Sequence, residues 1–149
     1  ARTPMQWNTE ENAGFTIGTP WYEVNPNYRE INAEEAVGRE TSVFYYYQKL
    51  IRLRRENEVM VYGKYELLLP QDEDIYSYTR TLGGRQWLII CNFHEKVRDV
   101  TGNRAGLVVI SNYADTPSLE ELRQLRPYEA VIYEIREPQE KAADYVMCR

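Results

Sequence analysis

The sequence predicts a mainly β protein, with an antiparallel β-sandwich over residues 63–136 that follows a long loop and one amphipathic helix within residues 1–62. Three observations support this prediction. The apolar residues of 42–57 recur with a helical period, the period becomes strand-like after Gly63, and about six short apolar segments follow with no helix between them. Closely spaced strands of this kind are typical of antiparallel sheets that pack face to face.

The first 29 residues are rich in proline, glycine and asparagine and show no sustained period, which predicts an ordered loop. Asn32 followed by Glu35 has the form of a helix start, and Gly38 supplies an end, so we expect a short helical turn at 33–37.

Residues 42–57 predict a strongly amphipathic helix. Polar side chains occupy one side, and the other carries an apolar stripe made of Val43, Phe44, Tyr47, Leu50 and Ile51. The apolar face of such a helix packs against another element, and we expect that element to be a sheet or a barrel. If this segment is isolated, we expect it to fold back on the sandwich or to self-associate through the stripe.

The strands are expected at 65–69, 75–81, 87–93, 97–100, 107–111 and 128–135. Gly83 and Gly84 predict a tight reversal, and the continuous apolar run after it predicts a strand buried on both faces. Residues 137–149 form a charged, weakly patterned tail, for which disorder and a short helix are both open.

Composition excludes several classes of protein. Hydrophobic residues make up 43% and charged residues 28%, as in a folded globular domain, and no apolar run approaches the roughly 20 residues of a spanning helix. The net charge of −5 argues against nucleic-acid and membrane partners. Cys91 and Cys148 lie in unlike contexts, which predicts neither a disulfide nor a metal site and fits a cytoplasmic location.

Several motifs in order carry a resemblance to a known family. They are ARTPMQW at 1–7, NAGFT at 12–16, TPW at 19–21, VNPNY at 24–28, YYQKLIRLR at 46–54 and LRPYEA at 125–130. Together they resemble the C-terminal part of the oligo-1,6-glucosidases, α-glucosidases of glycoside hydrolase family 13, the α-amylase family. Trehalose-6-phosphate hydrolases and dextran glucosidases are close relatives, and both stay open as alternatives.

The resemblance implies that residues 1–62 are the loop after the last strand and the last helix of a catalytic (β/α)8 barrel, followed by the sandwich over 63–136. It implies a parent enzyme that hydrolyses terminal α-1,6-glucosidic bonds of short oligosaccharides by a retaining mechanism with two carboxylates. The chain opens without an initiator methionine, so we expect it to be a fragment whose partner is the missing N-terminal barrel.

The family's catalytic motifs are absent from this sequence. The nucleophile stands in a Gly-x-Arg-x-Asp context and a second aspartate follows a histidine, whereas the single histidine here, His94, precedes Glu95. Carboxylate pairs such as Asp72 with Asp74, or Glu120 with Glu121, are expected on the solvated surface. We therefore expect no catalytic residue, metal or cofactor, and no hydrolysis by the chain alone.

Arg2 is the candidate substrate-binding residue. The resemblance places its loop at the rim of the barrel, where a guanidinium can hydrogen-bond sugar hydroxyls, and the alternative is that Arg2 ties down its own loop. Trp7 and Trp21 are expected to pack within that loop, with sugar stacking as the alternative. A competing hypothesis is a carbohydrate-binding module, because thirteen tyrosines are present and Tyr76 and Tyr78 would share a strand face.

Overall fold

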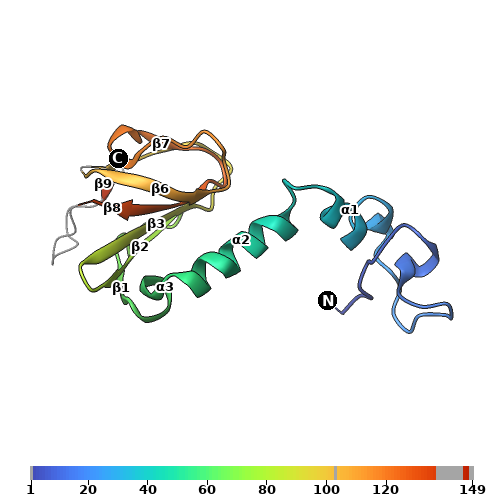
Figure 1. Ribbon diagram of the computed structural model, residues 1–149. Coiled ribbons are helices and arrows are strands. Elements are labelled where there is room, and N and C mark those ends of the chain that lie inside the picture. The colour runs from blue at the N-terminus through green and yellow to red at the C-terminus, as the bar shows by residue number, and fades with distance from the viewer. Residues whose placement is uncertain (1, 103, 137–145, 148–149) are drawn as a thin grey trace. The chain divides into compact units, whose positions relative to one another are not determined.

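The structure is a computed structural model that describes residues 2–102, 104–136 and 146–147 (Figure 1). The chain divides into two compact units, Ala1–Leu53 and Arg54–Arg149, which are described separately. Over the described residues the fold is mostly antiparallel sheet with few helices, as the sequence predicts.

The first unit consists of a long loop and short helices. The loop holds two 3₁₀ turns, η1 (Glu11–Gly14) and η2 (Pro26–Arg29), and is followed by α1 (Ala33–Gly38) and by α2 (Val43–Glu56), which continues into the second unit. The expected cap at Asn32 is confirmed, because its side chain accepts a hydrogen bond of 2.9 Å from the Glu35 N–H. At the start of α2 the hydroxyl of Ser42 donates to the Ala36 carbonyl, which ties the two helices together.

Backbone hydrogen bonds fix the loop. The N–H groups of Trp7 and Asn8 both donate to the Ala13 carbonyl, and the Glu34 N–H donates to the Trp7 carbonyl. Asn12, Ala13 and Gly14 all have positive φ values, of 53°, 56° and 65°. A Cβ on the last of these would lie 2.5 Å from the Asn8 side-chain oxygen, so glycine avoids both this contact and the strain of the left-handed backbone.

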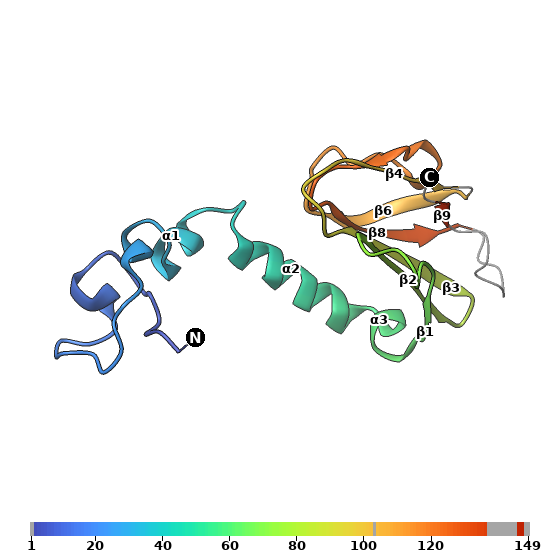
Figure 2. The ribbon, with the colours of Figure 1, turned by 180° about the vertical axis from the view of Figure 1, so that it is seen from behind.

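The second unit is built on a five-stranded sheet with the order β1-β2-β3-β8-β6, in which every neighbouring pair is antiparallel (Figure 2). Its strands are β1 (Lys64–Leu67), β2 (Ile75–Leu82), β3 (Arg85–Asn92), β6 (Gly106–Ser111) and β8 (Ala130–Ile135). The predicted Gly83–Gly84 reversal joins β2 to β3, and β3 is buried on both faces as expected.

Two small pairs of strands accompany the main sheet. Strand β4 (Arg98–Asp99) pairs with β7 (Gln124–Leu125), and β5 (Thr101–Gly102) pairs with β9 (Val146–Met147). Together with the 3₁₀ turn η3 (Leu119–Glu121), the β4–β7 pair lies over one face of the sheet in both ribbon views.

The hydrophobic core lies between that face and its cover. From the sheet it takes mainly Ile75, Leu88, Ile90, Val131 and Tyr133, and from the covering segments Val100, Leu119, Leu122 and Leu125. These side chains are all almost completely buried, and the burial of their apolar surface stabilises the sheet.

Some sequence predictions need correction. The segment expected as a strand at 97–100 forms only the two-residue β4, and α3 (Glu58–Tyr62) and β7 were not predicted. The last sheet strand begins at Ala130 and not at 128, because Tyr128 has φ 55° and lies in a turn. In the tail, 146–147 are paired as β9 where disorder or a helix was expected, and the rest of 137–149 lies outside the described residues.

Candidate functional site

Arg2 lies at an open hollow in the first unit. The hollow has a volume of about 230 Å³ and is lined by Arg2, Met5, Phe15, Trp21 and Tyr22, among others. This volume is below the range of about 300–1,000 Å³ typical of pockets that enclose a drug-sized ligand. The hollow can therefore receive one ring of a ligand, and it cannot enclose a larger molecule.

Aromatic rings form one wall of this hollow. The rings of Trp21 and Tyr22 are stacked, with centroids 6.1 Å apart and planes 7° from parallel. Trp21 is 94% exposed, so the expectation that it packs within the loop is wrong in this structure, and Trp7 is also half exposed. Exposed parallel rings can stack on the apolar face of a sugar.

Arg2 supplies the positive charge of the hollow. Among the described residues its guanidinium has neither an ion-pair partner nor a hydrogen-bond partner, so its donors remain available to a ligand. Gln6, by contrast, is committed to the loop, because its amide nitrogen donates to the Asn27 side chain at 3.0 Å and to the Ile31 carbonyl.

Two carboxylates border a second hollow of the first unit. Its lining includes Glu10, Glu11, Thr16 and Ile17, and Phe15 lines both hollows. The turn with positive φ values at Asn12 to Gly14 brings these residues together, because the chain reverses there. Asn12 holds the turn by donating hydrogen bonds to the carbonyls of Thr16 and Gly18.

The carboxylate pairs considered from the sequence have structural contacts. Asp72 accepts hydrogen bonds from the backbone N–H groups of Asp74 and Ile75, and Asp74 forms an ion pair with Arg98 at 3.0 Å. Glu120 and Glu121 accept hydrogen bonds from the Gly106 N–H and the Ser118 hydroxyl. The four carboxylates therefore stabilise turns and ends of strands.

His94 also takes part in a turn. Its Nδ1 accepts a hydrogen bond of 3.0 Å from the Lys96 N–H, and its backbone N–H donates to the Asn92 side chain. Within residues 2–102, 104–136 and 146–147, no group of three or more His, Cys, Asp or Glu side chains converges as a metal site would require.

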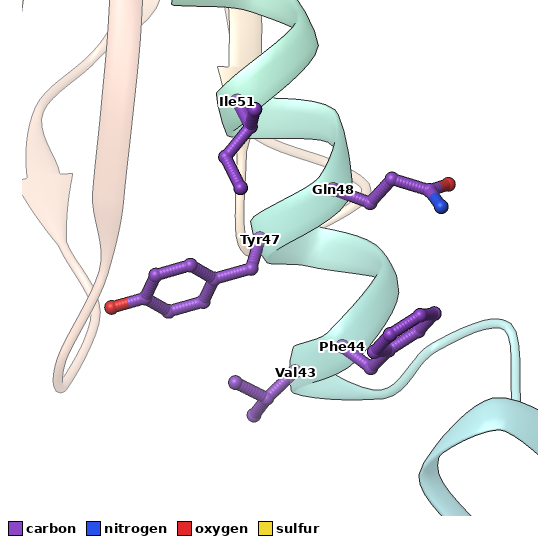
Figure 3. A pocket seen from close by; sticks show the side chains of 5 residues that line it. All are labelled: Val43, Phe44, Tyr47, Gln48 and Ile51. Atoms are coloured by element: carbon purple, nitrogen blue, oxygen red, sulfur yellow. The ribbon is translucent and has the colours of Figure 1, made fainter.

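Helix α2 presents the predicted apolar stripe to solvent. Val43 is 73% exposed, Tyr47 62% and Ile51 57%. Figure 3 shows these three side chains in one row along the helix, with Phe44 and Gln48 in the next row, and the five residues together line one open pocket. None of the described helices has the length and apolarity needed to span a bilayer.

Tyr65, Tyr76 and Tyr78 cluster on the sheet face opposite the core. The ring centroid of Tyr78 lies 5.2 Å from that of Tyr65 and 5.2 Å from that of Tyr76. The hydroxyls of Tyr65 and Tyr76 form a hydrogen bond of 3.2 Å. This hydrogen bond is the main reason that the pKa of Tyr65 is raised, to about 12. Burial raises the pKa of Tyr78 and of the neighbouring Cys91 thiol.

Comparisons with known proteins match this chain to members of one family. The family profile described as the catalytic domain of α-amylase matches residues 1–63. An oligo-1,6-glucosidase of Parageobacillus thermoglucosidasius is 52% identical over 145 residues, covering 93% of this chain and 26% of the relative. The chain belongs to the α-amylase family.

Enzymes of the α-amylase family with other names also match the chain, at lower identity. A trehalose-6-phosphate hydrolase of Bacillus subtilis is 39% identical, covering 93% of this chain and 26% of its own length. The crystal structure of a trehalose-6-phosphate hydrolase from Bacillus licheniformis superposes with a TM-score of 0.83 at 41% identity, covering 89% of this chain and 25% of that one. The chain thus spans about a quarter of the length of the relatives it matches.

A third member with a solved structure is the trehalulose synthase of Pseudomonas mesoacidophila. It superposes with a TM-score of 0.85 at 36% identity, over 91% of this chain and 25% of that one. The α-amylase-family relatives therefore include enzymes named for different reactions, and similarity alone does not choose among them.

Part of the Arg2 hollow could not be predicted from the sequence of this α-amylase-family chain. Phe15 and Tyr22 lie within or beside the motifs NAGFT and TPW, but nothing in their spacing shows that they meet Arg2. The loop brings them to one hollow only when it is folded, and its left-handed residues Asn12, Ala13 and Gly14 have no reliable sequence signal.

Proposed function

We propose that this chain is the C-terminal part of an α-glucosidase that hydrolyses terminal α-1,6-glucosidic bonds of short oligosaccharides. Its support is the 52% identity to an oligo-1,6-glucosidase, which extends over 93% of the chain. The two carboxylates of the retaining mechanism would lie in the preceding barrel, outside residues 1–149, so the chain alone is inactive.

In this proposal each of three segments of the chain has its own structural role. Residues 1–62 form the last loop and last helix of the (β/α)8 barrel, residues 63–136 form a C-terminal β-sandwich that stabilises it, and residues 137–149 are a tail. The match of the catalytic-domain profile to residues 1–63 supports the first assignment. A cytoplasmic location remains our prediction, and the free thiol of Cys91 agrees with it.

Arg2 is the substrate-binding residue in this proposal. Its unpaired guanidinium would donate hydrogen bonds to the hydroxyls of an oligosaccharide whose ring stacks on Trp21 or Tyr22. Arg2 binds and orients the sugar, and the transfer of protons belongs to the missing carboxylates.

The test is hydrolysis of isomaltose and of p-nitrophenyl α-glucoside by the purified chain, alone and mixed with the separately produced barrel portion. We expect no activity alone and restored activity on mixing. Activity of the chain alone, with contaminants excluded, would mean that a catalytic site lies among its own carboxylates.

An Arg2→Ala variant tests the binding role in the mixed enzyme. We expect kcat/KM to fall by about 10- to 100-fold, because one or two charge-assisted hydrogen bonds are lost. Arg39→Ala is the control, since Arg39 is an exposed arginine of the same unit that does not line the hollow. Equal effects of the two substitutions would rule out a specific role for Arg2.

A carbohydrate-binding module without catalysis is the second candidate function. The observation in its favour is the cluster of Tyr65, Tyr76 and Tyr78 on one sheet face. If this candidate is right, a gel containing dextran will retard the wild-type chain, and Tyr76→Ala will abolish the retardation. Absence of retardation leaves only the first candidate.

A further inference from the structure

Three tyrosine rings meet at one edge of the main sheet. Tyr65 lies on the edge strand β1, and Tyr76 and Tyr78 lie two residues apart on the neighbouring strand β2. The ring of Tyr78 contacts both of the others, with centroids 5.2 Å apart in each contact. In the part of the chain that the structure describes, no other two tyrosine rings are in contact. Two phenol rings can therefore react with each other most readily here.

Tyr65 is held against Tyr78. The backbone of Tyr65 pairs with Arg80, so Tyr78 is its diagonal neighbour across the two antiparallel strands. Diagonal neighbours lie about 7–8 Å apart, a separation that aromatic side chains can span. The planes of the two rings are tilted by 37°, and the Tyr65 hydroxyl also forms a hydrogen bond of 3.2 Å with the Tyr76 hydroxyl. These two contacts restrict the Tyr65 ring to a position beside Tyr78.

This geometry suits a carbon–carbon bond between the rings of Tyr65 and Tyr78. In dityrosine the bond joins the ring carbons next to the two hydroxyl groups, and the ring centres are slightly closer than the 5.2 Å found here. A small movement of the side chains would suffice, with the pairing of the strands unchanged. Tyr65 is nearly half exposed, so an oxidant in solution can reach its ring and water can accept its proton.

We propose that Tyr65 and Tyr78 form a site of oxidative cross-linking, where a haem peroxidase with hydrogen peroxide joins the two rings as dityrosine. Each ring gives up one electron and its hydroxyl proton. A radical formed on Tyr65 can pass to Tyr78 because the rings are in contact, and Tyr65 is then oxidised again. The two radicals couple at the ring carbons, whose hydrogens move to the oxygens. The two electrons and two protons released reduce one hydrogen peroxide to two waters.

The bond would fasten the edge strand β1 to β2 and close the loop between residues 65 and 78. A cross-link of this kind restricts the unfolded chain, as a disulfide does. Strand β1 pairs with only one other strand among the described residues, so it is an edge that gains from a covalent tie.

The test treats the dilute chain with peroxidase and hydrogen peroxide and isolates the monomer by size exclusion. Glutamate and aspartate residues occur at 66 and 72–74, so cleavage after them separates Tyr65 from Tyr78 and keeps Tyr76 and Tyr78 in one peptide. We expect mass spectrometry to find the two peptides joined, with the loss of two hydrogen atoms. Dityrosine confined to the peptide of Tyr76 and Tyr78, found only between chains, or absent would overturn the proposal.

Substitutions by phenylalanine identify the partners. Tyr65→Phe and Tyr78→Phe should each abolish the joined peptides, because phenylalanine keeps the ring and cannot form a phenol radical. Tyr76→Phe should retain them, since both partners remain. Tyr62→Phe is the matched control, because Tyr62 is an exposed tyrosine outside the cluster, and it should also retain them. Joined peptides that persist in Tyr78→Phe and disappear in Tyr76→Phe would exclude Tyr78 as the partner.

A comparison with the unfolded chain tests whether the fold positions the rings. In concentrated urea the joined peptides should nearly disappear, because contact between Tyr65 and Tyr78 depends on the pairing of β1 with β2. Added N-acetyltyrosinamide reports whether the peroxidase is still active under these conditions. Equal yields of joined peptides from the folded and unfolded chains would overturn the claim that the sheet creates this site.

Discussion

At the scale of single residues, Glu129 holds together a turn of the second unit. Its side chain is 1% exposed, and it accepts hydrogen bonds from the Arg126 guanidinium at 2.7 and 3.0 Å, from the Arg126 backbone N–H at 2.9 Å and from the Thr116 hydroxyl at 2.7 Å. The guanidinium also lies 3.9 Å from the centre of the Tyr113 ring. This network closes the turn before β8, where Tyr128 has its positive φ.

Replacing Glu129 with glutamine should destabilise the chain. The substitution leaves the charge of Arg126 without its main partner and places an amide N–H₂ where an acceptor is needed. We expect the free energy of unfolding to fall by about 2–3 kcal/mol, less than for a fully buried pair, because the Arg126 side chain is 30% exposed. Urea unfolding measures the change, and Glu95→Gln, an exposed control, should stay within about 0.5 kcal/mol of wild type.

The same network makes stability depend on pH. Burial alone would raise the pKa of Glu129, but the hydrogen bonds from Arg126 and Thr116 outweigh it and hold the pKa below its usual value. The hydrogen bond from Arg126 also lowers the pKa of Asp115. A carboxyl whose folded pKa lies below the unfolded one stabilises the fold above the unfolded pKa, and this contribution is lost as pH falls through the folded value.

We therefore expect the free energy of unfolding to decrease as pH falls below about 4.5, near the unfolded pKa of a glutamate. Urea unfolding at a series of pH values between about 7 and 3 gives the slope. In Glu129→Gln the slope should be shallower, because one of the responsible carboxyls is gone. An unchanged slope in the variant would assign the acid sensitivity to other groups.

At the scale of elements, α3 and β1 depend on a close approach at Gly63. The Gly63 N–H donates to the Val59 carbonyl at 3.1 Å, and a Cβ at this position would lie 2.3 Å from that oxygen. Arg80 strengthens the junction from β2, because its guanidinium donates to the carbonyls of Met60 and Val61. The helix therefore packs on the sheet through backbone contacts that tolerate no side chain at 63.

Gly63→Ala should destabilise the second unit by about 2–3 kcal/mol, because backbone atoms must move to relieve the contact. Gly83→Ala provides the comparison. Its φ is 56° but nothing lies near its Cβ position, so it should cost only about 1 kcal/mol of left-handed strain. Thermal unfolding followed by far-ultraviolet circular dichroism compares the stability of the two variants. A larger loss of stability in Gly83→Ala than in Gly63→Ala would contradict the steric argument.

At the scale of the whole molecule, the apolar stripe of α2 is exposed and offers a surface for another protein segment to cover. We propose that the barrel covers it in the parent enzyme and that this chain alone self-associates through it. Each apolar side chain of this size contributes about 1.5–3 kcal/mol when it is fully buried, so several together can hold two copies.

Light scattering coupled to size exclusion tests the self-association. We expect the wild-type chain to be larger than a monomer at tens of micromolar, and Tyr47→Lys with Ile51→Lys to be monomeric. Lys49→Glu, which changes charge on the opposite side of the helix, should not alter the mass. A wild-type monomer at all concentrations would exclude the proposal.

The sequence predicted the elements whose signals are local. The period of 42–57 predicted α2, Asn32 and Glu35 predicted the start of α1, and Gly83–Gly84 predicted the turn between two strands of the sheet. It failed for α3 and β7 and made β4 too long, because elements of two to five residues are too short to show a period.

The sequence alone also determined that the family's catalytic motifs are missing, since a motif is a property of the order of residues, and it singled out Arg2 through the motif ARTPMQW. Only the tertiary structure decided what surrounds Arg2. Phe15, Trp21 and Tyr22 line the same hollow as Arg2, although they lie 13 to 20 positions further along the chain. The tertiary structure likewise decided that Glu129 is a buried partner of Arg126, because burial depends on what the rest of the chain places around a side chain.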